Sequence, residues 1–154
     1  MVDFERHSRH ITLPNVGIEG QTKLSQSKIL CVGAGGLGSP VIQYLAAAGV
    51  GKITVIDDDV VNLSNLQRQV IHRTPDVGIP KVESAKRFVN DLDPKIEIIP
   101  LAKRLTEENI ESIFANQDVI VDGTDNIKTR YLIDEMSKKL GKPWVYGSVY
   151  RFEG

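Results

Sequence analysis

Residues 28–38 read Lys-Ile-Leu-Cys-Val-Gly-Ala-Gly-Gly-Leu-Gly, and this stretch decides the fold. Its first half is rich in β-forming residues and predicts a buried strand. The spacing of Gly33, Gly35 and Gly38 fits the G-x-G-x-x-G fingerprint, in which the backbone approaches a phosphate or ribose at the positive end of a helix. The stretch therefore predicts a strand, a turn and a helix around a nucleotide, with Gly35 and Gly36 at the closest approach.

An aspartate follows the next predicted strand at the distance this fingerprint expects. Asp57 lies 19 residues after Gly38, where a carboxylate can accept hydrogen bonds from both ribose hydroxyls. Two alternatives stay open on these residues alone. The glycines can form a tight turn without a ligand, or they can bind NAD.

Apolar runs alternate with helical patterns along the rest of the chain. Strands are expected at 28–32, 53–56, 96–99, 119–121 and 144–146, and helices at 39–48, 81–90 and 128–140, with a further helix that Thr106 caps and that carries Ile110, Ile113 and Phe114. This alternation predicts an α/β fold, a Rossmann-like, doubly wound, mostly parallel sheet with helices on both faces. Ligands of such sheets bind at the carboxyl ends of the strands.

The two ends of the chain differ from this pattern. We expect residues 1–26 to form an N-terminal helical segment, in which Pro14 and Gly17 interrupt any long helix. Residues 27–154 are expected to form the nucleotide-binding Rossmann-like domain. Because the chain stops at Gly154 just after a strand and without a terminal helix, we expect this domain to be truncated at its C-terminal end.

Composition excludes several classes of protein. The 154 residues are 41% apolar, enough for one globular core, and the formal net charge of -1 provides no basic field for nucleic acid. No apolar run approaches the roughly 20 residues of a membrane helix, and the polar N-terminus is no signal peptide, so a cytoplasmic protein is expected. The only cysteine, Cys31, lies in an apolar run and is expected to be a buried strand thiol.

Two cations favour a triphosphate over NAD. An NAD pyrophosphate is held mainly by backbone amides, whereas a triphosphate benefits from fixed guanidinium and ammonium groups. Arg68, in the polar block after Asp57, and Lys81, at the start of a helix, can supply them. The alternatives are a surface salt bridge for Arg68 and a solvated helix residue for Lys81.

A third polar block, Val-Asp-Gly-Thr-Asp-Asn at 121–126, ends another apolar strand. It should therefore lie on the same edge of the sheet as the glycine loop. Asp125 can ligate Mg²⁺, which binds one or two carboxylates together with phosphate oxygens. The alternative is an Asx turn or an N-cap for the helix at 128–140.

Taken in order, these motifs resemble those of the ubiquitin-activating-enzyme-like superfamily. They are Gly-Ala-Gly-Gly-Leu-Gly at 33–38, Asp57-x-Asp59-x-Val61-x-x-x-Asn65-Leu66-x-Arg68-Gln69, Gly78-x-Pro80-Lys81 and Thr124-Asp125-Asn126. The resemblance runs from about Arg6 to Gly154. It is strongest to the bacterial and archaeal adenylyltransferases that activate sulfur-carrier proteins in molybdopterin and thiamine biosynthesis.

The resemblance implies a role for each motif residue. Asp57 would hold the ATP ribose, Asn65, Arg68 and Lys81 would contact the phosphates, and Asp125 would bind Mg²⁺. In the N-terminal segment, the resemblance implies that Arg9 reaches the ATP site of a second subunit, so a homodimer is expected. His7 and His10 replace the usual Tyr and Gln of the family there and can alternatively bind a metal.

The implied activity is ATP-dependent adenylation. The partner would be a small ubiquitin-like sulfur-carrier protein ending in Gly-Gly, whose terminal carboxylate displaces pyrophosphate from ATP. Two other functions stay open on the sequence. One is a non-catalytic nucleotide-binding interaction module, and the other is an NAD-dependent oxidoreductase on the same fold.

Overall fold

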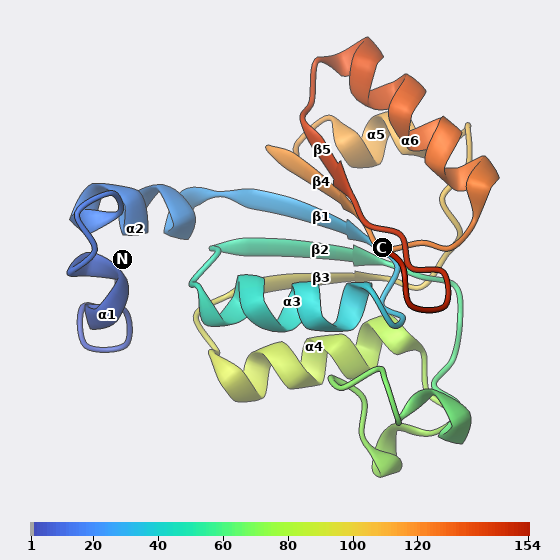
Figure 1. Ribbon diagram of the computed structural model, residues 1–154, viewed down its shortest axis with the longest axis horizontal. Coiled ribbons are helices and arrows are strands. Elements are labelled where there is room, and N and C mark those ends of the chain that lie inside the picture. Colours follow the sequence, from blue (N-terminus) through green and yellow to red (C-terminus); the bar gives the residue numbers. More distant parts are fainter. Residues whose placement is uncertain (1) are drawn as a thin grey trace.

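Five short apolar runs form one parallel sheet in the computed structural model, which describes residues 2–154 (Figure 1). The strands are β1 (Lys28–Val32), β2 (Lys52–Ile56), β3 (Glu97–Leu101), β4 (Val119–Asp122) and β5 (Trp144–Tyr146). Their order across the sheet is β3-β2-β1-β4-β5, and each neighbouring pair is parallel. All the predicted strands are confirmed, with small shifts at their ends.

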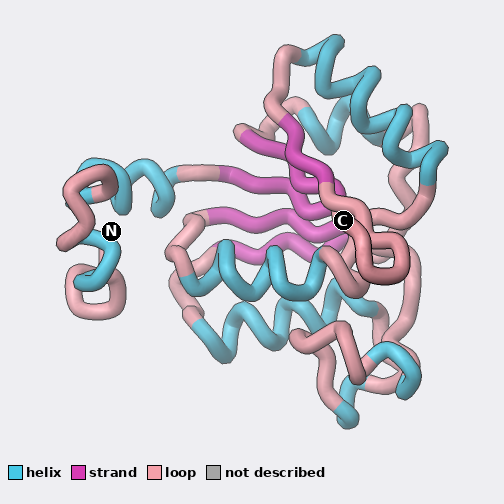
Figure 2. Tube along the Cα trace, in the orientation of Figure 1, coloured by secondary structure: helices cyan, strands magenta, loops and turns pink. Residues whose placement is uncertain are grey.

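Helices cover both faces of this sheet, as Figure 2 shows. They are α3 (Gly38–Ala47) and α4 (Lys81–Leu92) on one face, and α5 (Ile110–Phe114) and α6 (Ile127–Leu140) on the other. Successive β1 side chains alternate between the two layers, because a strand has a period of two. Ile29 and Cys31 enter the core under α3 and α4, whereas Leu30 and Val32 enter the core under α5 and α6. The Rossmann-like α/β class is thus confirmed.

The N-terminal residues form two short helices, α1 (Ser8–Ile11) and α2 (Gly17–Gln26). Figure 1 places both at the amino ends of the strands, away from the carboxyl ends. The buried Gln21 of α2 connects α1 to the domain. Its side-chain oxygen accepts from His10 of α1 at 3.0 Å, and its amide donates to the Ala48 carbonyl at the end of α3 at 2.8 Å. Gly17, at a φ of +57°, begins α2 as a separate helix, so the predicted interruption is confirmed.

Two glycines end helices, and the cysteine is buried as the sequence indicates. Gly49 and Gly141 have left-handed φ angles of 83° and 63° just after α3 and α6. Cys31 is fully buried, and burial raises the pKa of its thiol to about 12. None of the described helices is both long and apolar enough to cross a membrane.

The prediction that Thr106 caps the following helix is wrong. That helix, α5, begins only at Ile110, with Asn109 at its N-cap. The Asn109 side chain turns back and accepts the Thr106 N–H at 2.9 Å, while the Thr106 carbonyl accepts the Ile110 N–H. This local competition inserts one separate turn before the helix.

Candidate functional site

Polar loops surround one hollow at the carboxyl ends of the strands. The cavity has a volume of about 900 Å³. Its walls come from the glycine loop after β1, the loop after β2, the loop after β3, the 123–130 segment after β4, and residues 148–150 after β5. In the strand order, β1 and β4 are neighbours whose connections run to opposite faces of the sheet. The cavity therefore lies at the topological switch point, where ligands of doubly wound sheets bind.

The glycines of the first motif fall into two groups. A Cβ on Gly38 would lie 2.0 Å from the Gly33 carbonyl oxygen, and a Cβ on Gly33 would lie 3.1 Å from the Gly123 carbonyl oxygen. These residues are packed backbone against backbone. A Cβ on Gly35 or Gly36 would instead meet only the side chains of Gln69 or Arg68, at 3.5 Å or more. The first group holds the turn together, and the second group borders the cavity.

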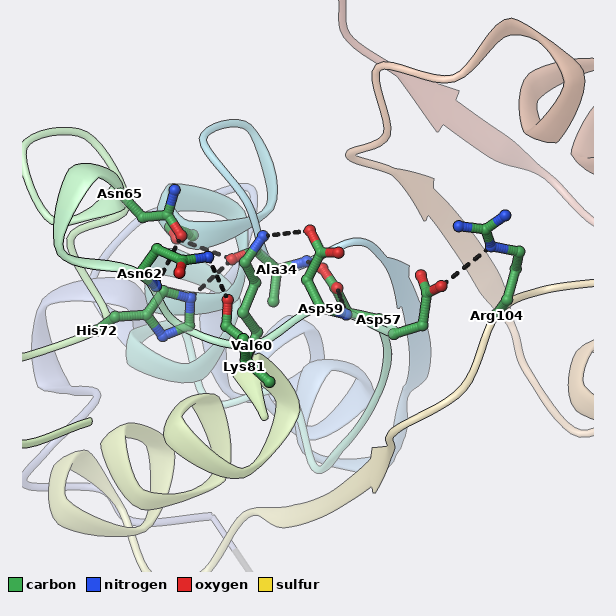
Figure 3. Close-up of polar contacts among 11 residues, drawn as sticks. Ala34, Asp57, Asp59, Val60, Asn62, Asn65, His72, Lys81 and Arg104 are labelled. Carbon is green, nitrogen blue, oxygen red and sulfur yellow. Dashed lines mark hydrogen bonds and ion pairs between the residues drawn. The ribbon is translucent and has the colours of Figure 1, made fainter. Parts of the chain in front are cut away.

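Asp57 holds its carboxylate at the base of the glycine loop. One oxygen accepts the Ala34 N–H at 2.8 Å, and the other accepts the Asp59 N–H at 2.8 Å (Figure 3). A carboxylate has about four lone-pair sites, so sites remain for two ribose hydroxyls. The carboxylate is therefore held in place by two backbone amides and still faces the cavity.

Arg68 and Asn65 enter the cavity from a 3₁₀ turn at Leu63–Asn65 and the residues that follow it. The Arg68 side chain is exposed and lies against Gly36. Its guanidinium donates to the Ser64 carbonyl at 3.3 Å and has no acidic partner within residues 2–154. The surface salt bridge considered from the sequence is therefore absent from the described part of the chain. The Asn65 side-chain oxygen accepts the Asn62 N–H at 3.0 Å, which leaves its amide group free to donate.

Lys81 is a buried cation at the first residue of α4. Its side chain is 7% exposed, and its Nζ lies 2.8 Å from the Asp59 carboxylate, which is itself 66% exposed (Figure 3). The interpretation of Lys81 as a solvated helix residue is therefore wrong. Burial and the ion pair with Asp59 hold the Lys81 ammonium at the wall of the cavity.

Asp125 takes neither of the structural roles considered for it. The Asx turn belongs to the buried Asp122, which accepts the Thr124 N–H at 2.8 Å and the Thr124 hydroxyl at 2.7 Å. The N-cap of α6 is Asn126, whose side chain accepts the Thr129 N–H at 3.2 Å. Asp125 is exposed, lines the cavity, and makes no hydrogen bond to another described residue. A free carboxylate on the wall of this cavity could hold Mg²⁺, which combines one or two carboxylates with phosphate oxygens.

Several residues of this hollow were missed from the sequence. Asp58 pairs with Arg104 at 3.0 Å across the ends of β2 and β3. Asp57, Asp58 and Asp59 bring carboxylate oxygens within 4.8 Å of one another. The half-buried Arg130 donates to the Thr124 and Gly147 carbonyls at 2.8 and 3.1 Å. For Asp58 and Arg104, the only signal in the sequence is their position shortly after a predicted strand. Arg130 has no such signal, because it lies within α6.

Arg9 is the one candidate that does not join the cavity. It is exposed on α1, beside the amino ends of the strands, and it does not line the hollow. The nearby His7 is buried and stacks on His10 with ring centres 5.8 Å apart. The metal site considered for this histidine pair has no third ligand among the described residues, because the only such cluster there is Asp57–Asp59.

Comparisons with known proteins agree with this geometry. A family model described as the ThiF family matches residues 7–154. The SAMP-activating enzyme E1 of Haloferax volcanii is 51% identical over 151 residues, which cover 98% of this chain and 56% of that protein. The sulfur carrier protein adenylyltransferase of Thermus thermophilus is 45% identical over 152 residues, with 99% of this chain and 56% of that protein covered. The chain thus spans a little over half the length of these curated relatives.

A solved structure supports the fold. The E. coli tRNA N6-threonylcarbamoyladenosine dehydratase, TcdA, in complex with ATP matches with a TM-score of 0.88 and 23% identity. The match covers 96% of this chain and 62% of that one. At this identity the likeness concerns the fold alone.

Proposed function

The chain belongs to the ThiF family, and from that premise we propose that it binds Mg-ATP at the carboxyl ends of the strands and adenylates the C-terminal carboxylate of a ubiquitin-like sulfur-carrier protein. One observation carries the proposal. Fixed cations, a free carboxylate and a restrained aspartate surround a single hollow beside a glycine loop. A triphosphate needs this combination, whereas a pyrophosphate held by backbone amides does not.

Each group has a defined task in this proposal. Asp57 accepts hydrogen bonds from the ribose hydroxyls on the lone pairs that Ala34 and Asp59 leave free. The free amide of Asn65, the guanidinium of Arg68 and the ammonium of Lys81 donate to phosphate oxygens. Asp125 is the residue that would hold Mg²⁺, which supplies positive charge to neutralise the phosphates when it is bound.

The reaction is an in-line transfer of the adenylyl group. A carboxylate oxygen of the carrier forms a bond to the α-phosphorus, the bond from that phosphorus to the pyrophosphate oxygen breaks, and the acyl adenylate and pyrophosphate result. The attacking carboxylate is already ionised and needs no general base. The leaving pyrophosphate gains negative charge, which Lys81, held by its ion pair with Asp59, and Arg68, bonded to the Ser64 carbonyl, stabilise.

We also propose that two subunits share each site. Arg9 lies beside the amino ends of the strands, so within one chain it does not line the ATP cavity. In a two-fold dimer, Arg9 of one protomer would complete the site of its partner. Inactive Arg9→Ala and Lys81→Ala proteins, once mixed, should then regain about a quarter of full activity, because half of the dimers are hybrids and each hybrid has one intact site. A monomer that adenylates the carrier would exclude shared sites.

Pyrophosphate exchange into ATP is the test of the function. With a carrier ending in Gly-Gly, we expect exchange in the unchanged chain, loss of exchange in Lys81→Ala, and normal exchange in Lys86→Ala. Lys86 is a lysine of the same helix that lies outside the cavity. ATP binding without any exchange would favour the interaction module. Stabilisation of the chain by NAD and not by ATP would favour an oxidoreductase. The cytoplasmic location and the absence of nucleic-acid binding stay predictions.

A further inference from the structure

We propose that His72 is a positioning residue for the nucleotide site, because it holds Ala34 of the glycine loop against Asp57 through a buried chain of hydrogen bonds. His72 is 4% exposed and does not line the cavity. It lies instead behind the glycine loop (Figure 3). The inference rests on the proposed binding of ATP, and it adds a residue to which neither the motifs nor the comparisons assign a task.

Ala34 is held from both sides. Its N–H donates to the Asp57 carboxylate at 2.8 Å, and its carbonyl accepts from His72 Nε2 at 2.9 Å. The Ser39 hydroxyl donates to the same carbonyl at a longer 3.3 Å. Ala34 is fully buried, so water cannot replace either contact. The two side chains fix the plane of the peptide groups that lead into Gly35 and Gly36.

The other side of the imidazole continues into α4. His72 Nδ1 lies 2.8 Å from the Ser84 hydroxyl, and the same hydroxyl lies 2.9 Å from the Asp76 carboxylate. Because the neutral imidazole donates through Nε2, the single hydroxyl proton serves one of these two acceptors at a time. Asp76 also accepts the Arg73 N–H at 3.0 Å and pairs with Arg87 at 3.3 Å. His72, Ser84 and Asp76 are all buried. A buried polar chain in which every member has a partner has one preferred geometry.

This chain connects the separate parts of the ATP site. Ala34 belongs to the loop after β1, and Asp57 directly follows β2. Ser84 lies in the first turn of α4, whose first residue is Lys81, the proposed phosphate-binding cation. A small displacement of any of these parts changes the distance between the ribose acceptor and the phosphate donors. Groups that bind or react must be held within about 0.5 Å, so the connection fixes a distance that binding requires.

Substitutions at His72 separate positioning from simple stability. His72→Leu removes the donor to Ala34, whereas His72→Gln keeps an N–H donor at a similar reach. Ser84→Ala leaves the imidazole in place and breaks the next link. Gln117→Leu is the matched control, because Gln117 is a buried amide under the opposite face that donates to Thr54 and Ile113 and lies outside the cavity.

Calorimetry with Mg-ATP and hydrogen exchange of the loop amides are the measurements. We expect His72→Leu to weaken ATP binding about tenfold, the effect of losing one buried hydrogen bond, and to speed exchange at Gly35 and Gly36. His72→Gln should restore most of the affinity, Ser84→Ala should fall between, and Gln117→Leu should lose stability without losing affinity.

Three results would overturn the assignment. They are unchanged ATP affinity in both His72→Leu and Ser84→Ala, no recovery in His72→Gln, and loop exchange in the His72 variants that matches the unchanged chain. The exchange readout needs no nucleotide, so it tests the positioning role even if the unchanged chain fails to bind ATP. That failure would count against the proposed function instead.

Discussion

The two ends of the sheet use similar polar side chains in different ways. At the amino ends, several polar groups have partners inside the protein: His10 bonds Gln21, Arg6 lies 3.4 Å from Asp93, and Asp3 pairs with Lys95 at 2.8 Å. At the carboxyl ends, Arg68 and Asp125 point into a cavity with no oppositely charged partner among the described residues.

The difference separates architecture from binding. Polar groups that are satisfied internally fix the N-terminal helices to the domain, and a ligand would have to break those bonds to gain them. Polar groups that are held in place yet unpaired can bind a ligand at little cost. This contrast supports the proposed nucleotide site at the carboxyl ends of the sheet, with the amino ends as its support.

The largest expected effect is a loss of stability, and we expect it for glycine substitutions at both ends of the sheet. Gly38→Ala should lower the free energy of unfolding by about 3 kcal/mol, because its Cβ would lie 2.0 Å from the Gly33 carbonyl oxygen. Gly51→Ala is the counterpart at the amino ends, where the Cβ would lie 1.9 Å from the Ser25 carbonyl oxygen. Urea unfolding of both variants is the measurement. A Gly38→Ala protein as stable as the unchanged chain would contradict the packing of the glycine turn.

A second glycine separates binding from folding. Gly36→Val should fold with nearly unchanged stability, because its Cβ would lie no closer than 3.5 Å to the Arg68 side chain, an ordinary van der Waals distance. It should nevertheless lose ATP binding by about tenfold or more, since a side chain there occupies the space beside the phosphates. Calorimetry with Mg-ATP decides the point. Normal affinity would make the loop a structural turn without a ligand.

Two aspartates at opposite ends provide a matched pair. Asp57→Ala should weaken ATP binding by about 1–3 kcal/mol, the cost of losing charge-assisted hydrogen bonds to the ribose. Asp3→Ala should leave the affinity unchanged, because Asp3 lies at the amino ends and only stabilises the fold. Its carboxylate accepts a hydrogen bond from Lys95, which lowers the pKa of Asp3 to about 2. If the two variants lose equal affinity, the ribose assignment fails.

The smallest effect is the response to acid, to which both ends contribute. Burial lowers the pKa of His7 and of His72 below the usual 6.5. The unfolded chain therefore binds protons near pH 6.5 that the folded chain does not, so the free energy of unfolding should fall as the pH drops from 7.5 through 6.5 toward 5. Urea unfolding at several pH values measures this. Stability that rises over this interval would contradict the neutral, buried state of these imidazoles.

The sequence predicted the carboxyl end of the sheet better than the amino end. Glycine spacing, the strand ends and the ordered motifs placed Asp57, Lys81 and Asp125 around one cavity, because parallel strands bring their carboxyl ends to one edge. The burial of Lys81 and its pairing with Asp59 could not be predicted, since the contact depends on how residues 60–80 fold back.

Two further features arise only from tertiary structure. The chain from Ala34 through His72 to Asp76 spans contacts up to 38 residues apart, and no local pattern marks it. The N-cap and the Asx turn after β4 are shared among neighbouring polar residues, and only the folded loop decides that Asn126 and Asp122 take them and leave Asp125 free.

A titration of the chain with Mg-ATP, followed by amide chemical shifts, tests the contrast between the two ends most directly. We predict shifts at the glycine loop, at Asp57–Lys81 and at 123–126, with the helices α1 and α2 unaffected in a monomer. If protomers share sites, only the residues next to Arg9 should also respond. Shifts centred on His7, Gln21 and Gly49, with the glycine loop unchanged, would contradict the assignment of the nucleotide site.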